Sequence, residues 1–257
     1  MIILHEHKKL PHIDAAVFDF DGTLSELRTG WESVMEPLMV ECIPGDRDEI
    51  TARVRAYIDE STGIQTIHQM RWLSDQVAKS GGKALDPWDY KTEYNRRLMV
   101  EVGRRRQSIA DGRASRGDYL VPGAEEFLAE LCAGGTSLYA ASGTDDADVK
   151  AEAAILGLDR YFAEIAGAPA GSDRCSKEAV LERLMTANRG ANLLVVGDGR
   201  VEIALGRDAG ALTLGICYGK NLNADGLEAD KARRLTGAGA HALVYDFTNL
   251  KEILTWI

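Results

Sequence analysis

The amino-acid sequence predicts an α/β fold: a doubly wound parallel sheet into which an all-helical segment is inserted. Short apolar runs without polar alternation recur along the chain, as in strands that are covered on both faces. From about residue 120 onward helical patterns separate these runs, which is typical of a parallel sheet with right-handed crossovers. Before that, about 95 residues of helical character separate the first strand from the second, which is too long for a crossover connection.

Five apolar runs are the predicted strands. Each is only a few residues long and is rich in Val, Leu, Ile, Ala or an aromatic residue, so periodicity alone favours burial on both faces. The runs are Ala15–Phe20, Ser137–Ser142, Leu193–Gly197, Ala211–Ile216 and Ala242–Tyr245.

Helical patterns connect the later strands. Pro122–Cys132 carries its apolar residues on one stripe, and a proline suits the first turn of a helix. A second helix is predicted over Asp146–Leu156, where Gly157 is placed to end it. Strand and helix therefore alternate through this half of the chain.

The insertion between the first two strands contains helical segments and no convincing strand. We expect it to form a separate helical domain over residues 25–117, with residues 1–24 and 118–257 forming the core. The predicted helices are Trp31–Val40, Asp46–Asp59, Ile64–Lys79 and Pro87–Ile109.

Composition indicates a soluble globular protein, since 45% of the 257 residues are apolar and 27% are charged. The formal net charge of −10 disfavours a general nucleic-acid binder, which needs a basic face. No stretch approaches the roughly 20 apolar residues of a membrane span, and the N-terminal apolar run is too short for a signal peptide. We therefore expect a cytoplasmic protein with no nucleic-acid or membrane partner. Reduced thiols fit this expectation, because no CxxC spacing links Cys42, Cys132, Cys175 and Cys217.

The strongest local signal is Asp19-Phe20-Asp21-Gly22-Thr23, which follows the first apolar run. A glycine at this point lets the backbone turn sharply off the strand. Because side chains alternate along an extended segment, Asp19 and Asp21 point to the same side. The two carboxylates crowd each other unless a metal ion or a phosphoryl group lies beside them.

Three further signals follow other predicted strands. Asp198 comes directly after one of them, and Glu202 falls in the first turn of the next helix, where it offers more oxygen ligands for a hard cation. Ser142 and Gly143 close another strand, where a hydroxyl and main-chain amides can bind an anion. Lys177 lies at the start of a later helix. Read singly, these residues also fit an acidic turn, a simple helix cap and a solvent-facing lysine, so their weight comes from their occurrence together.

Topology brings these signals together. In a parallel sheet all strands end at one edge, and ligands bind at that edge. Since Asp19, Ser142 and Asp198 each follow the end of a predicted strand, the sequence predicts one shared site for them.

The order of these motifs resembles that of the haloacid dehalogenase superfamily of phosphohydrolases. The resemblance covers about Ala15–Thr23 and Asp118 onward, and it is specific for the superfamily rather than for a substrate. It implies a Rossmann-like catalytic core and, for residues 25–117, a C1-type helical cap domain, as in relatives of phosphoglycolate phosphatase and β-phosphoglucomutase.

The resemblance implies a magnesium-dependent phosphatase acting on a small phosphorylated metabolite. In such an enzyme Asp19 attacks phosphorus and becomes an aspartyl phosphate, while Asp21 protonates the leaving alkoxide and then activates water. Mg²⁺ is held by Asp19, the main-chain carbonyl of Asp21 and Asp198, with Glu202 supporting the metal or its waters. Glutamate at this last position is a mild departure from the aspartate that is common there.

The phosphoryl oxygens are held, by the same resemblance, by Ser142, the Gly143 loop and Lys177. These roles fit the physics, because phosphoryl transfer depends mainly on positioning and on neutralising charge at the transferring group. A carboxylate nucleophile also splits hydrolysis into two easier steps.

Two alternative functions stay open. A phosphomutase of the β-phosphoglucomutase kind shares every core residue and differs only in whether water reaches the aspartyl phosphate. A non-catalytic binding or regulatory module on the same fold is expected to lack at least one of the acids or the lysine, and all are present.

Two charged segments have simple interpretations. Arginines gather between residues 96 and 116, which we interpret as a solvated helix end, since no aromatic residue interleaves residues 104–116 as a nucleic-acid stacking platform requires. His5, His7 and His12 precede the first predicted strand, and we expect a frayed terminus there.

Substrate selection is expected to involve the insertion. Arg28 lies where the chain leaves the core, and arginine suits bidentate recognition of a second anionic group, with Trp31 as an apolar wall. Gln65, at the start of another predicted helix, is placed to reach a polar substrate. The alternative for Arg28 is a surface ion pair with Glu26 or Glu32.

Overall fold

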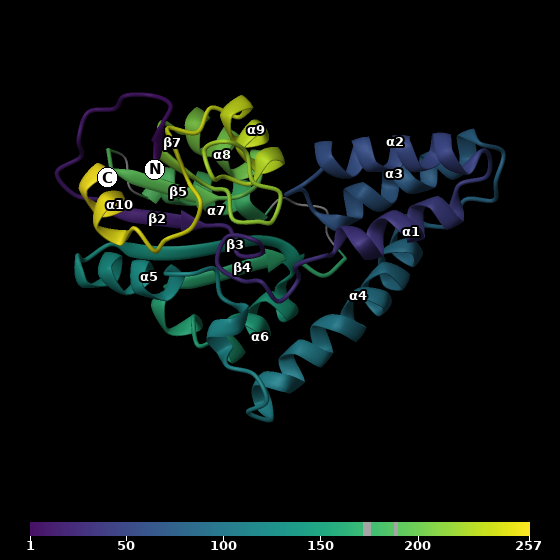
Figure 1. The fold of residues 1–257 in the computed structure, drawn as a ribbon, viewed down its shortest axis with the longest axis horizontal. Coiled ribbons are helices and arrows are strands. Elements are labelled where there is room, and N and C mark those ends of the chain that lie inside the picture. Colours follow the sequence, from purple (N-terminus) through teal and green to yellow (C-terminus); the bar gives the residue numbers. More distant parts are fainter. Residues whose placement is uncertain (172–175, 188–189) are drawn as a thin grey trace.

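The computed structural model describes residues 1–171, 176–187 and 190–257. The chain forms a layered α/β core, and the helices of the insertion extend from one side of it (Figure 1). The predicted fold class, a Rossmann-like core with a helical insertion, is confirmed. One predicted feature, Cys175, lies outside the described residues, whereas Cys42, Cys132 and Cys217 are free thiols.

The core is built on one sheet, whose order within the described residues is β1-β7-β6-β5-β2-β3-β4. All neighbours pair in parallel except β1, which runs antiparallel to β7 at the edge. The central position of β2 between β3 and β5 places the end of β2 at the middle of the carboxyl edge. The strands are β1 (Ile2–Ile3), β2 (Ala15–Phe18), β3 (Ser137–Asp145), β4 (Glu164–Ala168), β5 (Leu193–Gly197), β6 (Leu212–Ile216) and β7 (Ala242–Val244).

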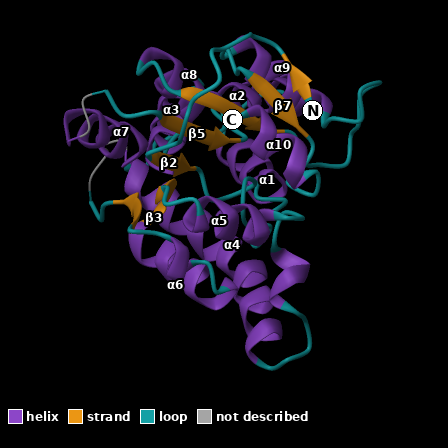
Figure 2. Ribbon diagram, turned by 90° about the vertical axis from the view of Figure 1, so that its left-hand side faces the viewer, coloured by secondary structure: helices purple, strands orange, loops and turns teal. Residues whose placement is uncertain are grey.

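Helices cover both faces of the sheet, with α5 and α6 on one side and α8 and α9 on the other (Figure 2). Because side chains alternate along a strand, β2 contributes Ala16 and Phe18 to one face and Ala15 and Val17 to the other. The core helices are α5 (Ala124–Ala133), α6 (Asp146–Leu156), α7 (Ser176–Ala187), α8 (Arg200–Asp208), α9 (Ala229–Gly237) and α10 (Leu250–Trp256).

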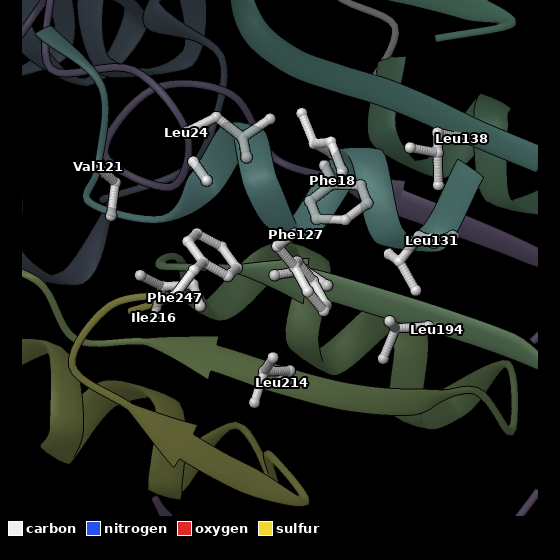
Figure 3. Close-up of a cluster of buried hydrophobic side chains, with 14 of the residues drawn as sticks. Phe18, Leu24, Val121, Phe127, Leu131, Leu138, Leu194, Leu214, Ile216 and Phe247 are labelled. Atoms are coloured by element: carbon white, nitrogen blue, oxygen red, sulfur yellow. The ribbon is translucent and has the colours of Figure 1, made fainter. Parts of the chain in front are cut away.

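The larger apolar cluster lies under α5 and fixes the end of β2. Phe18 and Phe127 meet edge to face with ring centroids 6.0 Å apart, and Phe127 stacks on Phe247 at 5.1 Å (Figure 3). All three rings are fully buried, so each adds hydrophobic stabilisation on the order of 2–3 kcal/mol. This packing holds the residues that follow Phe18 in a defined place.

The inserted helices form a second apolar cluster of their own. Met35, Leu73 and Val102 are among its fully buried members. Asp46 and Asp86 cap two of the helices by accepting hydrogen bonds from main-chain N–H groups of their first turns. We call α1–α4 the inserted helices: α1 (Glu32–Cys42), α2 (Arg47–Glu60), α3 (Thr66–Lys79) and α4 (Pro87–Ala110). The division at residues 24/25 and 117/118 stays a prediction, since α4 also packs against α6.

The predicted elements correspond closely to the observed ones. The four inserted helices lie within two residues of their predicted ends, and α6 ends at the predicted Gly157, whose φ is 71°. The prediction that Pro122 lies in the first turn of α5 is wrong. The helix begins at Ala124, because Gly123 adopts a left-handed φ of 77° before it.

Two strands were not predicted. The strand β4 holds an acid and a glycine in five residues, and β1 has only two residues, so neither has a readable pattern. The frayed N-terminus was a wrong expectation. The main-chain N–H groups of Leu4 and His5 donate to the carbonyl of His241 at 2.8 and 3.1 Å, which fixes this segment beside β7. Among the described residues, none of the helices has the length and apolarity needed to cross a bilayer.

Candidate active site

The turn after β2 presents the first acid at the carboxyl edge. The N–H of Asp19 still donates to the Val196 carbonyl of β5 at 2.9 Å, so its buried side chain is held beside that strand. Gly22 then turns the chain with φ 77°. A Cβ atom on Gly22 would lie 2.4 Å from Asp198 Oδ2, so only glycine lets the two segments approach this closely.

Lys177 joins two of the predicted acids. Its Nζ lies 3.0 Å from Asp19 Oδ1 and 2.8 Å from Glu202 Oε2, and all three side chains are buried. Burial raises the pKa of Asp19 well above its ordinary value, although the Lys177 charge opposes that shift. Burial lowers the pKa of Lys177, but Asp19 and Glu202 more than compensate, so its net pKa is raised. Asp19 and Lys177 therefore face each other in a site that is largely shielded from solvent.

Asp19, Asp198 and Glu202 form an acidic cluster, in which one oxygen from each lies within 4.8 Å of the others. Glu202 is oriented by the N–H of Gly199, which donates to its Oε1 at 2.6 Å at the start of α8. An oxygen-only donor set suits a hard cation such as Mg²⁺, whose octahedral ligands lie roughly 3–4 Å apart. The chemistry of the cluster fits a magnesium ion.

A second lysine, Lys231 of α9, lies at the same cluster and was not predicted. Its Nζ is 2.8 Å from Asp198 Oδ2 and donates to the Gly22 carbonyl at 3.4 Å. Burial raises the pKa of Asp198, but the Lys231 charge and hydrogen bond outweigh it, so that the net pKa is lowered. No pattern in the sequence distinguishes this lysine from one on a solvated helix.

Asp21 faces the end of β3. Its Oδ2 accepts hydrogen bonds from Ser142 Oγ at 3.0 Å and from Thr144 Oγ1 at 2.8 Å. Its Oδ1 is buried without a hydrogen bond and lies 3.8 Å from Nε of Arg28. Ser142 therefore contacts the second aspartate in this structure. Thr144 contacts the same carboxylate, although the sequence predicted a role only for Ser142 and Gly143.

Arg28 is buried and already has carboxylate partners. Its Nη2 and Nε donate to the two oxygens of Glu152 in α6 at 2.7 and 3.0 Å. The expected alternative partners, Glu26 and Glu32, were wrong, because the guanidinium turns into the core rather than along its own surface. Burial raises the pKa of Glu152 to about 7, although Arg28 opposes the shift. Glu152 was missed, since an acid on a buried helix face gives no sequence signal.

A cavity of about 650 Å³ lies over the carboxyl edge, between the sheet and the inserted helices. Asp19, Lys177 and Gly143 line its floor, and Arg28 and Trp31 also line it. Gln65 is buried but is not among the lining residues, whereas Gln69, one turn further along α3, is. The remaining polar groups from the inserted helices include Lys91, Tyr94 and Asn95 of α4.

The sequence matches the family model described as haloacid dehalogenase-like hydrolase over residues 13–210. The chain belongs to this family. The resemblance inferred from the motifs is thereby confirmed, and the protein is a haloacid dehalogenase-like hydrolase. The matched residues include the three acids of the cluster and Lys177, whereas Lys231 lies beyond them.

Known relatives of this haloacid dehalogenase-like hydrolase agree with that assignment. Phosphoglycolate phosphatases of Salmonella choleraesuis and Salmonella typhi are each 26% identical over 222 residues, which are 83% of this chain and 84% of each relative. A predicted phosphoglycolate phosphatase from Haemophilus somnus has a TM-score of 0.60 at 18% identity and covers 96% of this chain and 100% of that one. A β-phosphoglucomutase from Clostridium difficile has a TM-score of 0.57 at 16% identity, covering 95% and 96%. At these identities the two solved structures show a shared fold.

Proposed function

We propose that this hydrolase is a Mg²⁺-dependent phosphatase that cleaves the phosphomonoester of a small metabolite through an aspartyl-phosphate intermediate. The observation that carries the proposal is the position of Asp19, which lies 3.0 Å from Lys177 and within the acidic cluster of Asp198 and Glu202. Asp19, Lys177 and Asp198 line one cavity, and Glu202 contacts Lys177 beside it, so the carboxylate, the cation and the donor set for a hard metal lie together.

The two aspartates divide the reaction between them. Asp19 attacks phosphorus while Asp21 gives a proton to the leaving alkoxide, so the P–O bond to the alcohol breaks as the aspartyl–phosphate bond forms. Asp21, now ionised, then takes a proton from water, whose oxygen attacks phosphorus and releases Asp19 and inorganic phosphate. The Thr144 hydroxyl holds Asp21 beside the site for both steps, and the single hydroxyl proton of Ser142, which Asp21 accepts in the free protein, turns to the phosphoryl group when the substrate binds.

The negative charge on the transferring phosphoryl group must be neutralised, and two sets of residues contribute to this: those that contact its oxygens and those that would bind Mg²⁺. Lys177 supplies a fixed positive charge, and Ser142 and the Gly143 amide supply hydrogen-bond donors to the phosphoryl oxygens. Asp19, the main-chain carbonyl of Asp21, Asp198 and Glu202 would hold Mg²⁺. When bound, this ion offsets charge on the nucleophile and the phosphoryl group.

We propose that residues 25–117 act as a cap domain that closes the cavity and selects the substrate. Lys91, Asn95 and Trp31 offer polar and apolar contacts from the inserted helices. The loop before α3 also reaches the core, since the Gly63 carbonyl accepts a hydrogen bond from Lys177 at 3.4 Å, and Gln65, which is buried at the start of this helix, stays a candidate for polar contact with the substrate. Both Nε and Nη2 of Arg28 donate to Glu152. We therefore propose that Arg28 positions Asp21 and does not contact the substrate directly.

Phosphate release from a panel of phosphorylated metabolites, with and without Mg²⁺, tests the proposal. Phosphoglycolate belongs first in the panel, because the curated relatives bear its name. The expected result is Mg²⁺-dependent release of phosphate from one compound class. Interconversion of sugar phosphates without phosphate release would instead identify a mutase, and no turnover of any compound would contradict an enzymatic role.

A further inference from the structure

The acidic cluster has a second internal cation that the family resemblance does not assign. Lys231 Nζ lies 2.8 Å from Asp198 Oδ2 and 3.4 Å from the Gly22 carbonyl. The Lys231 side chain is 16% exposed and that of Asp198 is 11% exposed, so solvent screens the contact weakly. Lys231 is also outside the residues that match the family model.

The two lysines divide the cluster between them. Lys177 pairs with Asp19 and Glu202, and Lys231 pairs with Asp198, so each of the three carboxylates faces an ammonium group. A buried carboxylate without a partner is strongly destabilising. The arrangement therefore stabilises the three carboxylates when no divalent cation is bound. It also places the Lys231 ammonium group against Asp198, which is one of the residues that would bind such a cation.

Hydrogen bonds of α9 hold the main chain at Lys231 in place, so that its side chain starts from a defined point and can still change its partner. Glu228 caps α9 by accepting a hydrogen bond from the main-chain N–H of Lys231 at 2.7 Å. One turn later, Arg234 Nη1 lies 2.7 Å from Asp59 of α2, which anchors the same helix to the inserted segment. Glu26 and Glu32 line the same cavity as Lys231, so they offer its ammonium group other carboxylate partners.

We infer that Lys231 is an internal counter-ion that competes with the divalent cation for Asp198. It pairs with Asp198 in the metal-free protein and moves toward Glu26 and Glu32 when the cation binds. The inference rests on the proposed function, because it takes Asp198 to be a metal ligand. Its consequence is a weakened affinity for the cation, since binding must displace an existing ion pair.

Direct titration with Mn²⁺, followed by the electron paramagnetic resonance signal of the free ion, measures this without turnover. Lys231→Met should bind Mn²⁺ about tenfold more tightly than the wild type, which corresponds to about 1.4 kcal/mol. Lys231→Arg, which keeps the charge, should stay near the wild-type affinity. Lys220→Met is the matched control, because Lys220 is an exposed lysine lining the same cavity. It should leave the affinity unchanged.

Thermal unfolding gives a second readout that does not depend on catalysis. Without metal, Lys231→Met should unfold at a lower temperature than the wild type because Asp198 loses its partner, and saturating Mg²⁺ should remove most of that difference. Unchanged or weaker Mn²⁺ binding by Lys231→Met, with tight binding by the wild type, would overturn the inference alone. Absence of Mn²⁺ binding in the wild type, with Asp198→Asn no different, would overturn the proposed metal site and the inference together.

Discussion

Arg28 and Glu152 form a bidentate ion pair at 2.7 and 3.0 Å that connects the start of the inserted segment to helix α6 of the core. The Glu152 side chain is fully buried, and Asp148 and Asp21 lie 3.5 and 3.8 Å from the same guanidinium. Removing Glu152 leaves the buried guanidinium with only the longer contacts to Asp148 and Asp21, and breaking a buried pair in this way costs about 3–5 kcal/mol. The pair therefore has consequences for stability and for the placement of Asp21.

Glu152→Ala should lower the free energy of unfolding by about 3 kcal/mol or more, measured by urea denaturation at pH 8. Asp148→Ala is the matched control, because Asp148 is a more exposed acid beside the same guanidinium, and it should cost less than about 1 kcal/mol. Equal small losses for both variants would contradict the structural role of the pair.

Arg28→Ala separates a positioning role from substrate binding. If Arg28 holds Asp21, the variant should lose at least tenfold in kcat on an alkyl phosphate with little change in KM, because protonation of the alkoxide is impaired. Hydrolysis of p-nitrophenyl phosphate, whose leaving group needs little protonation, should fall less. A rise in KM confined to the natural substrate would favour direct recognition by Arg28 instead.

Asp19→Asn should abolish turnover while keeping the fold. Loss of the nucleophile is expected to reduce kcat by about a thousandfold or more, which corresponds to about 4 kcal/mol. Because burial raises the pKa of Asp19, its charge is unfavourable in the folded protein, and the neutral amide should leave the melting temperature unchanged or higher. Activity above about a thousandth of the wild type, in protein free of contaminating enzyme, would argue against a covalent role.

Activity should disappear with EDTA and return with Mg²⁺. The donor set of Asp19, Asp198 and Glu202 contains oxygen only, which favours Mg²⁺ over softer metals. Phosphate release measured across a titration of Mg²⁺ into EDTA-treated protein checks this. Full activity in metal-free buffer, or restoration by Zn²⁺ but not by Mg²⁺, would contradict it.

The main elements of the fold and the position of Asp19, Asp198 and Glu202 were predictable because they depend on local patterns. Apolar runs mark buried strands, and a parallel sheet gathers the strand ends at one edge. Glu152 and Lys231 were not predictable, because their roles come from contacts with residues more than 30 positions away in the sequence. Such pairing depends on how α6 and α9 pack, which no single-sequence periodicity records.

The ordered N-terminus was unpredictable for the same reason, because it depends on contacts with His241, which is distant in the sequence and lies beside β1. The Nδ1 of His241 lies 2.8 Å from Thr213 Oγ1, and its Nε2 lies 2.7 Å from Arg207 Nη1. Since a guanidinium can only donate, Nε2 faces a donor, and the main-chain N–H of Thr213 also points at Nδ1 at 3.1 Å, so both contacts disfavour the doubly protonated ring. Partial burial, together with the charges of Arg207, His7 and His5, lowers the pKa of His241 to about 4.

The direction of the pH effect follows from this shift. The folded-state pKa lies below the ordinary value of 6.5, so between pH 6.5 and 4 the unfolded chain binds more protons at this position than the folded one. The contribution of His241 is therefore complete above about pH 6.5 and is lost as the pH falls toward 4. Because His241 is only partly buried, solvent screens the effect and we expect a loss of only about 1 kcal/mol.

Thermal unfolding of the wild type and of His241→Gln between pH 8 and pH 4.5 tests the assignment. Glutamine keeps an acceptor near Arg207 but does not titrate. The melting temperature of the variant should therefore fall less on acidification than that of the wild type. His12→Gln is the control, because His12 is an exposed histidine elsewhere on the surface. It should follow the wild-type curve. Parallel curves for the wild type and His241→Gln would show that the contact with Arg207 does not control protonation of His241, and acid sensitivity would then have to originate elsewhere in the chain.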